Sequence, residues 1–153
     1  MKHIFLINPA AGSRGRQAEL AGVCRKVALE QNLEYEILVT EHPGHGVELV
    51  RKACLQGGGQ HLRFYACGGD GTLNEVARPN FGMWNVAVGH FPAGTGNDFI
   101  KVFGRQMNRF SHLPELTKGE ELPVDYVETN CGGAVNVLSV GIDARVAAGM
   151  RKY

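Results

Sequence analysis

The sequence predicts an α/β fold in which helices cover both faces of a parallel sheet. Short apolar runs of strand length alternate along the chain with longer stretches whose apolar residues recur at helical spacing. Three of these runs lead directly into glycine-rich loops, as is typical of strand-to-helix connections in parallel sheets. With 153 residues, 44% of them hydrophobic and 20% charged, the chain has the size and composition of one globular domain and little more.

The elements follow from the patterns in order. Ile4–Ile7 is uninterrupted by polar residues, as in a strand buried on both faces, and the stretch after it places Leu20, Val23 and Val27 on one helical face. Three consecutive glycines, Gly57 to Gly59, end the second helix. In chain order, we expect a strand at Ile4–Ile7, a helix at 14–31, a strand at Tyr35–Thr40, a helix at 46–56, a strand at Leu62–Cys67, a helix at Thr72–Ala77 and a strand at Val86–Phe91.

The rhythm changes after Asp98. Ser111 is expected to cap a short helix that tolerates Pro114 in its first turn. Two further strands, at Val124–Thr129 and Ala134–Val140, are expected to pair as a hairpin around Cys131-Gly132-Gly133, and a last helix is expected at 147–153. We therefore predict an α/β domain over residues 1–123 and the incomplete beginning of a second domain over residues 124–153.

Charge, cysteines and hydropathy exclude several classes. The formal net charge is +1 and no basic block is interleaved with aromatic residues, so no nucleic-acid partner is expected. The four cysteines form no CxxC pair, which argues against a zinc site and favours reduced thiols in a cytoplasmic protein. No stretch approaches the roughly 20 apolar residues of a membrane-spanning helix. The six histidines, His90 among them, lack metal-ligand spacing and are assigned to the surface or to packing.

Three loops carry the functional signal: the first loop, residues 8–13, the second loop, residues 68–72, and the third loop, residues 92–98. Each follows an expected strand, and the carboxyl ends of parallel strands meet at one edge of the sheet, so the loops should converge there. Glycines let the backbone approach an anion, and N–H groups at the following helix favour negative charge. Ser13, Thr72 and Thr95 add hydroxyl donors. This combination predicts a polyphosphate ligand.

Asp70 and Asp98 lie within the second and third loops. A carboxylate beside a phosphate is repulsive unless a divalent cation lies between them, and Mg²⁺ commonly takes one or two carboxylates together with waters and phosphate oxygens. The two aspartates are therefore expected to bind Mg²⁺, directly or through water.

Other interpretations of the loops compete with this one. The second loop could be a tight turn, with Thr72 and Glu75 forming a capping box that needs no ligand. One glycine-rich loop of this kind could be a turn without a ligand. Three of them at corresponding strand ends argue against that interpretation. The dinucleotide fingerprint and the Walker phosphate loop are both excluded, because Gly44-His45-Gly46 lacks the third glycine and the chain contains no Gly-Lys-Ser or Gly-Lys-Thr.

The loops resemble those of one family. Gly68-Gly69-Asp70-Gly71-Thr72-Leu73-Asn74-Glu75-Val76 closely resembles the signature of the diacylglycerol kinase catalytic domain, whose superfamily includes sphingosine kinases, ceramide kinases and bacterial lipid kinases. Asn8-Pro9-x-Ala11-Gly12 and Gly94-Thr95-Gly96-Asn97-Asp98-Phe99 resemble its first and third nucleotide loops, and Asn136-x-x-Ser139-x-Gly141-x-Asp143-Ala144 resembles the start of its second domain. Arg78-Pro79 and Ile100-Lys101 depart from the usual pattern, behind the phosphate loops.

The resemblance implies a three-layer α/β sandwich, like the N-terminal domain of NAD kinases and diacylglycerol kinases, and transfer of the γ-phosphate of ATP to a lipid hydroxyl such as that of diacylglycerol. It implies a magnesium and water network at Asp70, Asp98 and Asp125. The residues that it places against ATP are Asn8, Pro9, Ala10, Ala11, Gly12, Thr40, Gly68, Gly69, Asp70, Gly71, Thr72, Leu73, Asn74, Glu75 and Thr95.

The same resemblance implies a chain of about twice this length, with a β-sandwich second domain closing the lipid cleft. The 153 residues are then a truncated member whose general base lies beyond Tyr153. Such a chain binds nucleotide but does not necessarily catalyse phosphoryl transfer. Its partner is a lipid at a membrane surface, which implies peripheral association, and an apolar edge exposed by truncation would favour a homodimer. Two alternatives remain: an NAD kinase, which shares the Gly-Gly-Asp-Gly-Thr loop but not the third loop, and a non-catalytic nucleotide-binding module.

Overall fold

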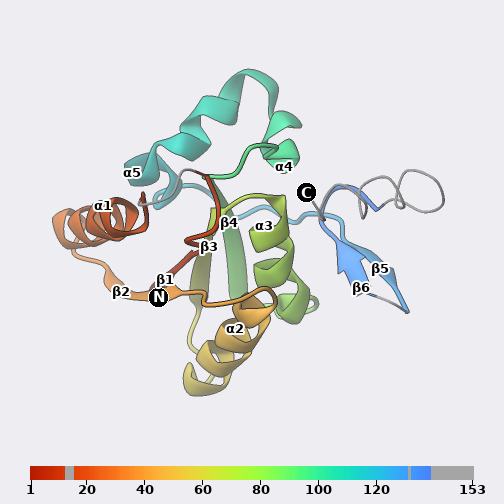
Figure 1. Cartoon of the computed structure of the whole chain (residues 1–153). Coiled ribbons are helices and arrows are strands. Elements are labelled where there is room, and N and C mark those ends of the chain that lie inside the picture. Colours follow the sequence, from red (N-terminus) through yellow and green to blue (C-terminus); the bar gives the residue numbers. More distant parts are fainter. Residues whose placement is uncertain (13–15, 131, 139–153) are drawn as a thin grey trace.

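Four parallel strands form the central sheet of the computed structural model, which describes residues 1–12, 16–130 and 132–138 (Figure 1). The strands are β1 (Lys2–Ile7), β2 (Glu34–Val39), β3 (Leu62–Gly68) and β4 (Val86–Pro92), in the spatial order β2-β1-β3-β4. The central pair is in register from Lys2 opposite Leu62 to Ile7 opposite Cys67. The predicted α/β fold with a parallel sheet is confirmed.

Helices cover both faces of this sheet. Those on one face are α2 (His45–Gln56) and α3 (Asp70–Ala77), and those on the other are α1 (Arg16–Glu30) and α5 (Leu113–Leu116) (Figure 1). The sequence did not predict the short helix α4 (Asp98–Lys101) or the two 3₁₀ helices η1 (Arg78–Asn80) and η2 (Gly104–Ser111). Over the described ranges, no helix has the length and apolar character needed to cross a bilayer.

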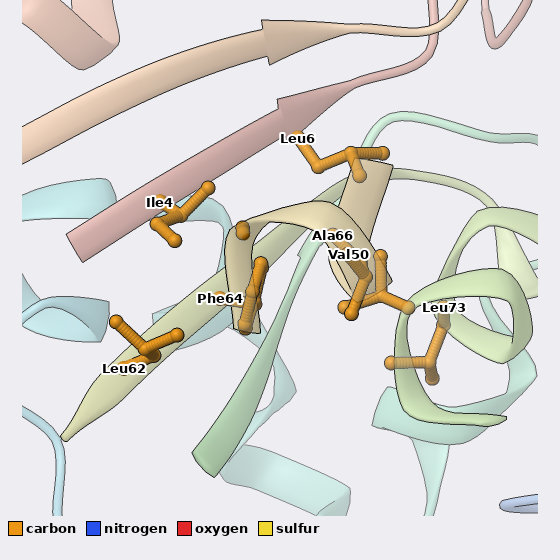
Figure 2. Packing of buried hydrophobic residues seen from close by; sticks show 9 residues of the cluster. Ile4, Leu6, Val50, Leu62, Phe64, Ala66 and Leu73 are labelled. Atoms are coloured by element: carbon orange, nitrogen blue, oxygen red, sulfur yellow. The ribbon is translucent and has the colours of Figure 1, made fainter. Parts of the chain in front are cut away.

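The core lies in two layers because side chains of a strand alternate between its faces. Ile4 and Phe64 point to the face covered by α2 and α3, where they pack with Val50 and Leu73 (Figure 2). Phe5 and its neighbours point to the opposite face; that second cluster consists of Phe5, Ile7, Cys24, Val27, Ala28, Tyr65, Cys67 and Leu113. Burial on both faces explains why Ile4–Ile7 of β1 is an uninterrupted apolar run, since each large buried apolar side chain contributes roughly 1.5–3 kcal/mol.

The three described cysteines are free thiols and differ in burial. Cys24 and Cys67 are fully buried free thiols in the second cluster. Cys54 is free but only half-buried, and its thiol donates to Asn80 Oδ1 at 3.3 Å. Cys131 lies outside the described residues.

The C-terminal part differs from the prediction in detail. Ser111 ends η2 instead of capping a helix, and α5 begins at Leu113 after His112, with Pro114 in its first turn as expected. A hairpin is present, but its strands are β5 (Val127–Thr129) and β6 (Gly132–Ala134), so two glycines predicted to form the turn lie in the second strand.

Glycine is needed in β6 because of its neighbours. A Cβ atom on Gly133 would lie 2.5 Å from the Tyr126 hydroxyl and ring, and Gly132 has a φ of +137°. The hairpin projects away from the main sheet (Figure 1), after an extended segment, residues 119–126, without helix or strand. The boundary at residues 123/124 and the incomplete second domain stay predictions, and the expected helix at 147–153 and the motif from Ser139 to Ala144 lie outside the described residues.

Candidate functional site

The three glycine-rich loops meet at the carboxyl ends of β1, β3 and β4, as their positions in the sequence predict. Asn8 N–H donates to Cys67 C=O at 3.0 Å, which ties the first loop to the end of β3, and Ala93 N–H donates to Gly68 C=O at 2.9 Å, which joins the third loop to the second. The first and third loops are in close contact, because a Cβ atom placed on Gly12 would lie 2.6 Å from Ala93 O. Ser13 lies outside the described residues.

A side-chain bridge joins the first loop to the second. Asn8 Nδ2 donates to Thr72 Oγ1 at 2.9 Å, and Asn8 Oδ1 accepts the Ala10 N–H at 2.9 Å. Thr72 is buried, with 4% of its surface exposed. The bridge fixes the first loop against the start of α3.

The capping-box interpretation is wrong. The residue before α3 is Gly69, and no side chain caps the helix. Glu75 instead accepts hydrogen bonds from Gly44 N–H at 2.9 Å and Gly46 N–H at 3.0 Å, at the start of α2. Within the described residues, the N–H groups of the first turn of α3 therefore have no side-chain acceptor, and a helix start of this kind favours an anion.

Close packing explains one glycine in each of the second and third loops. A Cβ on Gly68 would lie 2.3 Å from Thr72 Oγ1, and one on Gly94 would lie 2.5 Å from the Cα of Gly69. Real Cβ atoms do not come so near to other heavy atoms, so both positions need glycine. Asn97, in the left-handed region at φ +50°, closes the third loop by donating its Nδ2 to Gly94 O at 2.7 Å.

Two of the three expected metal-binding aspartates lie on the same side of the third loop. Asp70 Oδ1 accepts the Phe99 N–H at 3.2 Å. A Cβ atom added to Gly96 would lie 3.1 Å from Asp70 Oδ2 and 3.9 Å from Asp98 Oδ2, so both carboxylates lie near this glycine. The other oxygen of Asp98 accepts a hydrogen bond from Lys101 Nζ at 2.5 Å, which raises the pKa of this lysine. Asp70 and Asp98 together offer carboxylate oxygens that a hydrated cation could share.

The third aspartate of the expected network is not assembled with the other two. Asp125 is exposed in the extended segment before β5. In the part of the chain that the structure describes, no three His, Cys, Asp or Glu side chains lie close enough together to hold a metal ion. The two loop aspartates still suit Mg²⁺, which needs only one or two carboxylates when phosphate oxygens and waters complete its coordination.

The remaining expected nucleotide contacts differ in their surroundings. Thr40 is buried at the end of β2, where its N–H donates to Ile7 C=O at 2.9 Å, and Thr95 is exposed on the third loop. Leu73 belongs to the core, and Asn74 Oδ1 accepts the Val135 N–H at 3.2 Å beyond the hairpin. Leu73 and Asn74 thus contact the core and the segment after the hairpin, whereas Asp70 and Thr72 contact the third and first loops.

One residue beside the site was not among the expected site residues. His90 of β4 is fully buried, and its Nε2 lies 3.0 Å from Gly68 O, where the second loop begins. Its assignment to packing agrees with this burial. The available signal was a polar residue within an apolar strand, two positions before the third loop.

The chain is similar in sequence to known proteins. The sequence profile described as the diacylglycerol kinase catalytic domain matches residues 2–129. YtlR of Bacillus subtilis, named as a lipid kinase, is 33% identical over 119 residues, which cover 77% of this chain and 38% of that protein. A YegS-like lipid kinase of Klebsiella pneumoniae, so named, is 30% identical over 145 residues, covering 94% of this chain and 46% of the relative.

Solved structures show the same fold. A diacylglycerol kinase from Bacillus anthracis superposes with a TM-score of 0.67 at 23% identity, covering 96% of this chain and 52% of that structure. The chain thus spans about half the length of the proteins that it matches.

Proposed function

The chain belongs to the diacylglycerol kinase catalytic domain family, and we propose that it binds ATP with Mg²⁺ as the nucleotide-binding portion of a lipid kinase. The acceptor that we propose is the hydroxyl of a lipid such as diacylglycerol, met at a membrane surface. The observation that carries the proposal is the convergence of three glycine-rich loops around the uncapped start of α3.

Each part of the site has a proposed task. Backbone N–H groups at the start of α3 bind phosphate oxygens, and the glycines of the second and third loops keep side chains out of their way. The Asn8–Thr72 bridge holds the first loop beside them. Asp70 and Asp98 hold Mg²⁺, which neutralises phosphate charge when it is bound.

The transfer step needs more than these groups. Phosphoryl transfer depends mainly on positioning and charge neutralisation, but the attacking hydroxyl must be oriented as well. We propose that the residue that does so, and the surface that binds the lipid, belong to a part of the protein outside these 153 residues. The matched regions cover 38% and 46% of the two relatives, which leaves room for both.

Calorimetric titration of the chain with Mg-ATP and Mg-ADP tests nucleotide binding. We expect saturable heat with both nucleotides. If the protein is shown to be folded and no heat appears up to about millimolar nucleotide, a range that covers ordinary enzyme affinities, the proposed site is wrong.

Incubation with labelled ATP and either short-chain diacylglycerol or NAD tests the acceptor. Label in the lipid supports a lipid kinase, whereas label in NADP and none in the lipid would indicate an NAD kinase. Nucleotide binding without transfer to either acceptor agrees with a nucleotide-binding portion that needs the rest of the protein, or with a non-catalytic module. Adding that remaining part separates these two, because only the former then gains activity.

A further inference from the structure

His90 occupies an unusual place in β4. Its backbone lies opposite Ala66 of β3, and its side chain is fully buried near the ring of Phe99, with the ring centroids 6.3 Å apart. Nε2 lies 3.0 Å from Gly68 O, whereas Nδ1 is buried without a hydrogen-bond partner among the described residues. Because a carbonyl oxygen only accepts, Nε2 carries the proton and Nδ1 is a bare acceptor in the neutral ring. Burial lowers the pKa of His90, which favours this neutral form.

This histidine is not what fold stability alone would select. A buried polar atom without a partner costs folding free energy, and an apolar side chain of similar size would avoid that cost. The carbonyl of Gly68 also does not depend on the imidazole, because Ala93 N–H already donates to it at 2.9 Å. The hydrogen bond from His90 is thus a second one to an oxygen that is already satisfied.

What the second hydrogen bond adds is orientation. The peptide bond between Gly68 and Gly69 is a plane, so fixing the direction of its C=O also fixes the direction of the Gly69 N–H on the opposite side. Gly69 is the residue before α3 and is in contact with Gly94 of the third loop. Neither glycine has a side chain that could restrict this peptide, so restraint must come from outside the loop.

We propose that His90 is a positioning residue of the phosphate loop: through Gly68 it holds the peptide that precedes α3 in the orientation needed to receive a phosphate. The part concerning phosphate rests on the proposed function, whereas the restraint of the loop is a property of the protein without ligand. The experiment measures the two separately.

Three variants isolate the donor. His90→Leu removes both ring nitrogens, His90→Gln places an amide donor at the position of Nε2, and His90→Asn places its amide at the position of Nδ1, out of reach of Gly68. For each variant, backbone hydrogen exchange of residues 68–73 is measured without nucleotide, with residues 4–7 of β1 as the internal reference. The thermal midpoint and the affinity for Mg-ATP are measured on the same samples.

We expect exchange in residues 68–73 to become at least about fivefold faster in the Leu and Asn variants, with β1 unchanged, because local opening is detected segment by segment. The Leu variant should keep or raise the thermal midpoint, since it removes the unpartnered Nδ1, and yet bind Mg-ATP about tenfold more weakly. The Gln variant should stay within about twofold of the original protein in both exchange and affinity. A residue that only packs the core would give loss of stability, faster exchange throughout and no rescue by Gln.

The outcomes are distinct. Unchanged exchange in residues 68–73 of the Leu variant, or of the Asn variant if Leu fails to fold, overturns the proposal. So does failure of Gln to restore slow exchange. If exchange responds as expected but the original protein binds no Mg-ATP, the restraint by His90 stands and the proposed nucleotide function fails.

Discussion

Gly69 and Gly94, which belong to different loops, approach each other so closely that a Cβ atom on Gly94 would lie 2.5 Å from the Cα of Gly69 and 3.1 Å from its backbone nitrogen. The obstacle is backbone rather than the end of a flexible side chain, so it cannot move aside without displacing a loop. This contact joins the second loop to the third.

Replacing Gly94 by alanine should therefore separate the two loops. We expect Gly94→Ala to lower the free energy of unfolding by about 1–3 kcal/mol, as overpacking does. The loss in the free energy of Mg-ATP binding should be larger than this loss in stability. Urea unfolding and calorimetry measure the two effects. The matched control is Gly22→Ala in α1, where a Cβ meets nothing within 4 Å and alanine should add about 0.5–1 kcal/mol. Equal behaviour of the two variants would contradict the close contact.

Glu75 provides a second prediction, because its carboxylate binds two backbone N–H groups at the start of α2. Glu75→Gln removes the charge that favours this helix end and leaves one oxygen for two donors. We expect a loss of about 1 kcal/mol in the free energy of unfolding. Glu48→Gln, the same change at an exposed position in the first turn of α2, should have a smaller effect. An equal loss in both would mean that charge alone, without the hydrogen bonds, accounts for the effect.

The fold and the meeting of the loops could be predicted because both depend on local patterns. A strand buried on both faces must be apolar throughout, as Ile4 to Ile7 is, and parallel strands necessarily bring the loops that follow them to one edge. Neither inference needs knowledge of which side chains touch.

Side-chain partners could not be predicted in this way. Thr72 and Glu75 fit the capping-box spacing, but each forms its hydrogen bonds with a distant segment. Thr72 bonds to Asn8, and Glu75 bonds to the N–H groups at the start of α2. In the hairpin, contact between Gly133 and Tyr126 places glycines inside a strand, where local preference predicts a turn. Tertiary contacts overrode propensity in both cases.

The loop aspartates should confer dependence on magnesium. Asp70→Asn keeps an oxygen to accept the Phe99 N–H and removes only the charge, so the loop should keep its geometry. We expect Mg-ATP to bind about tenfold more weakly to this variant and to Asp98→Asn. Binding of ATP in EDTA, where the carboxylates only repel phosphate, should be unchanged or stronger.

Asp125→Asn tests the remaining member of the expected magnesium network. Because the described structure does not group Asp125 with the loop aspartates, we expect little change in this chain. A loss as large as that of the Asp70 variant would place Asp125 in the network. An unchanged dependence on magnesium in the Asp70 variant would instead remove that residue from it.

Acid should destabilise the fold through His3. Its Nδ1 lies 2.8 Å from the Tyr65 hydroxyl, and burial, followed by the positive charges of Arg63 and the N-terminal amino group, lowers the pKa of His3 from its ordinary value of 6.5. The unfolded chain thus binds the proton more readily, so the free energy of unfolding is at its full value above pH 6.5 and falls as the pH drops below it, down to the folded-state pKa. Burial also lowers the pKa of His90, so its protonation should likewise reduce the free energy of unfolding in acid.

Thermal midpoints between pH 7.5 and 5.5 measure this effect. His3→Asn leaves an acceptor near the position of Nδ1 and cannot titrate, so its midpoint should fall less than that of the original protein. His42→Asn, the same change at an exposed position, is the matched control. If the His3 variant keeps the full slope, protonation of His3 is not the cause.

The bridge between Asn8 and Thr72 can be measured by a double-mutant cycle. Asn8→Ala and Thr72→Val each remove one partner of the 2.9 Å hydrogen bond, and the double variant removes both. We expect a coupling of about 1 kcal/mol in the free energy of unfolding, the usual net value of such a bond. Thr72→Ser keeps the hydroxyl and should preserve most of this coupling.

A parallel cycle between Thr72 and Glu75 shows whether the bridge or the capping box stabilises the start of α3. In a capping box the Thr72 hydroxyl accepts from the backbone N–H of Glu75, and the Glu75 carboxylate accepts from the backbone N–H of Thr72, so their changes would couple. Here Glu75 binds the start of α2 instead, so Thr72→Val and Glu75→Gln should add within about 0.3–0.5 kcal/mol. A Thr72–Glu75 coupling that exceeds the Asn8–Thr72 coupling would mean that the first loop is not tied to α3, and Asn8→Ala should then leave Mg-ATP binding unchanged.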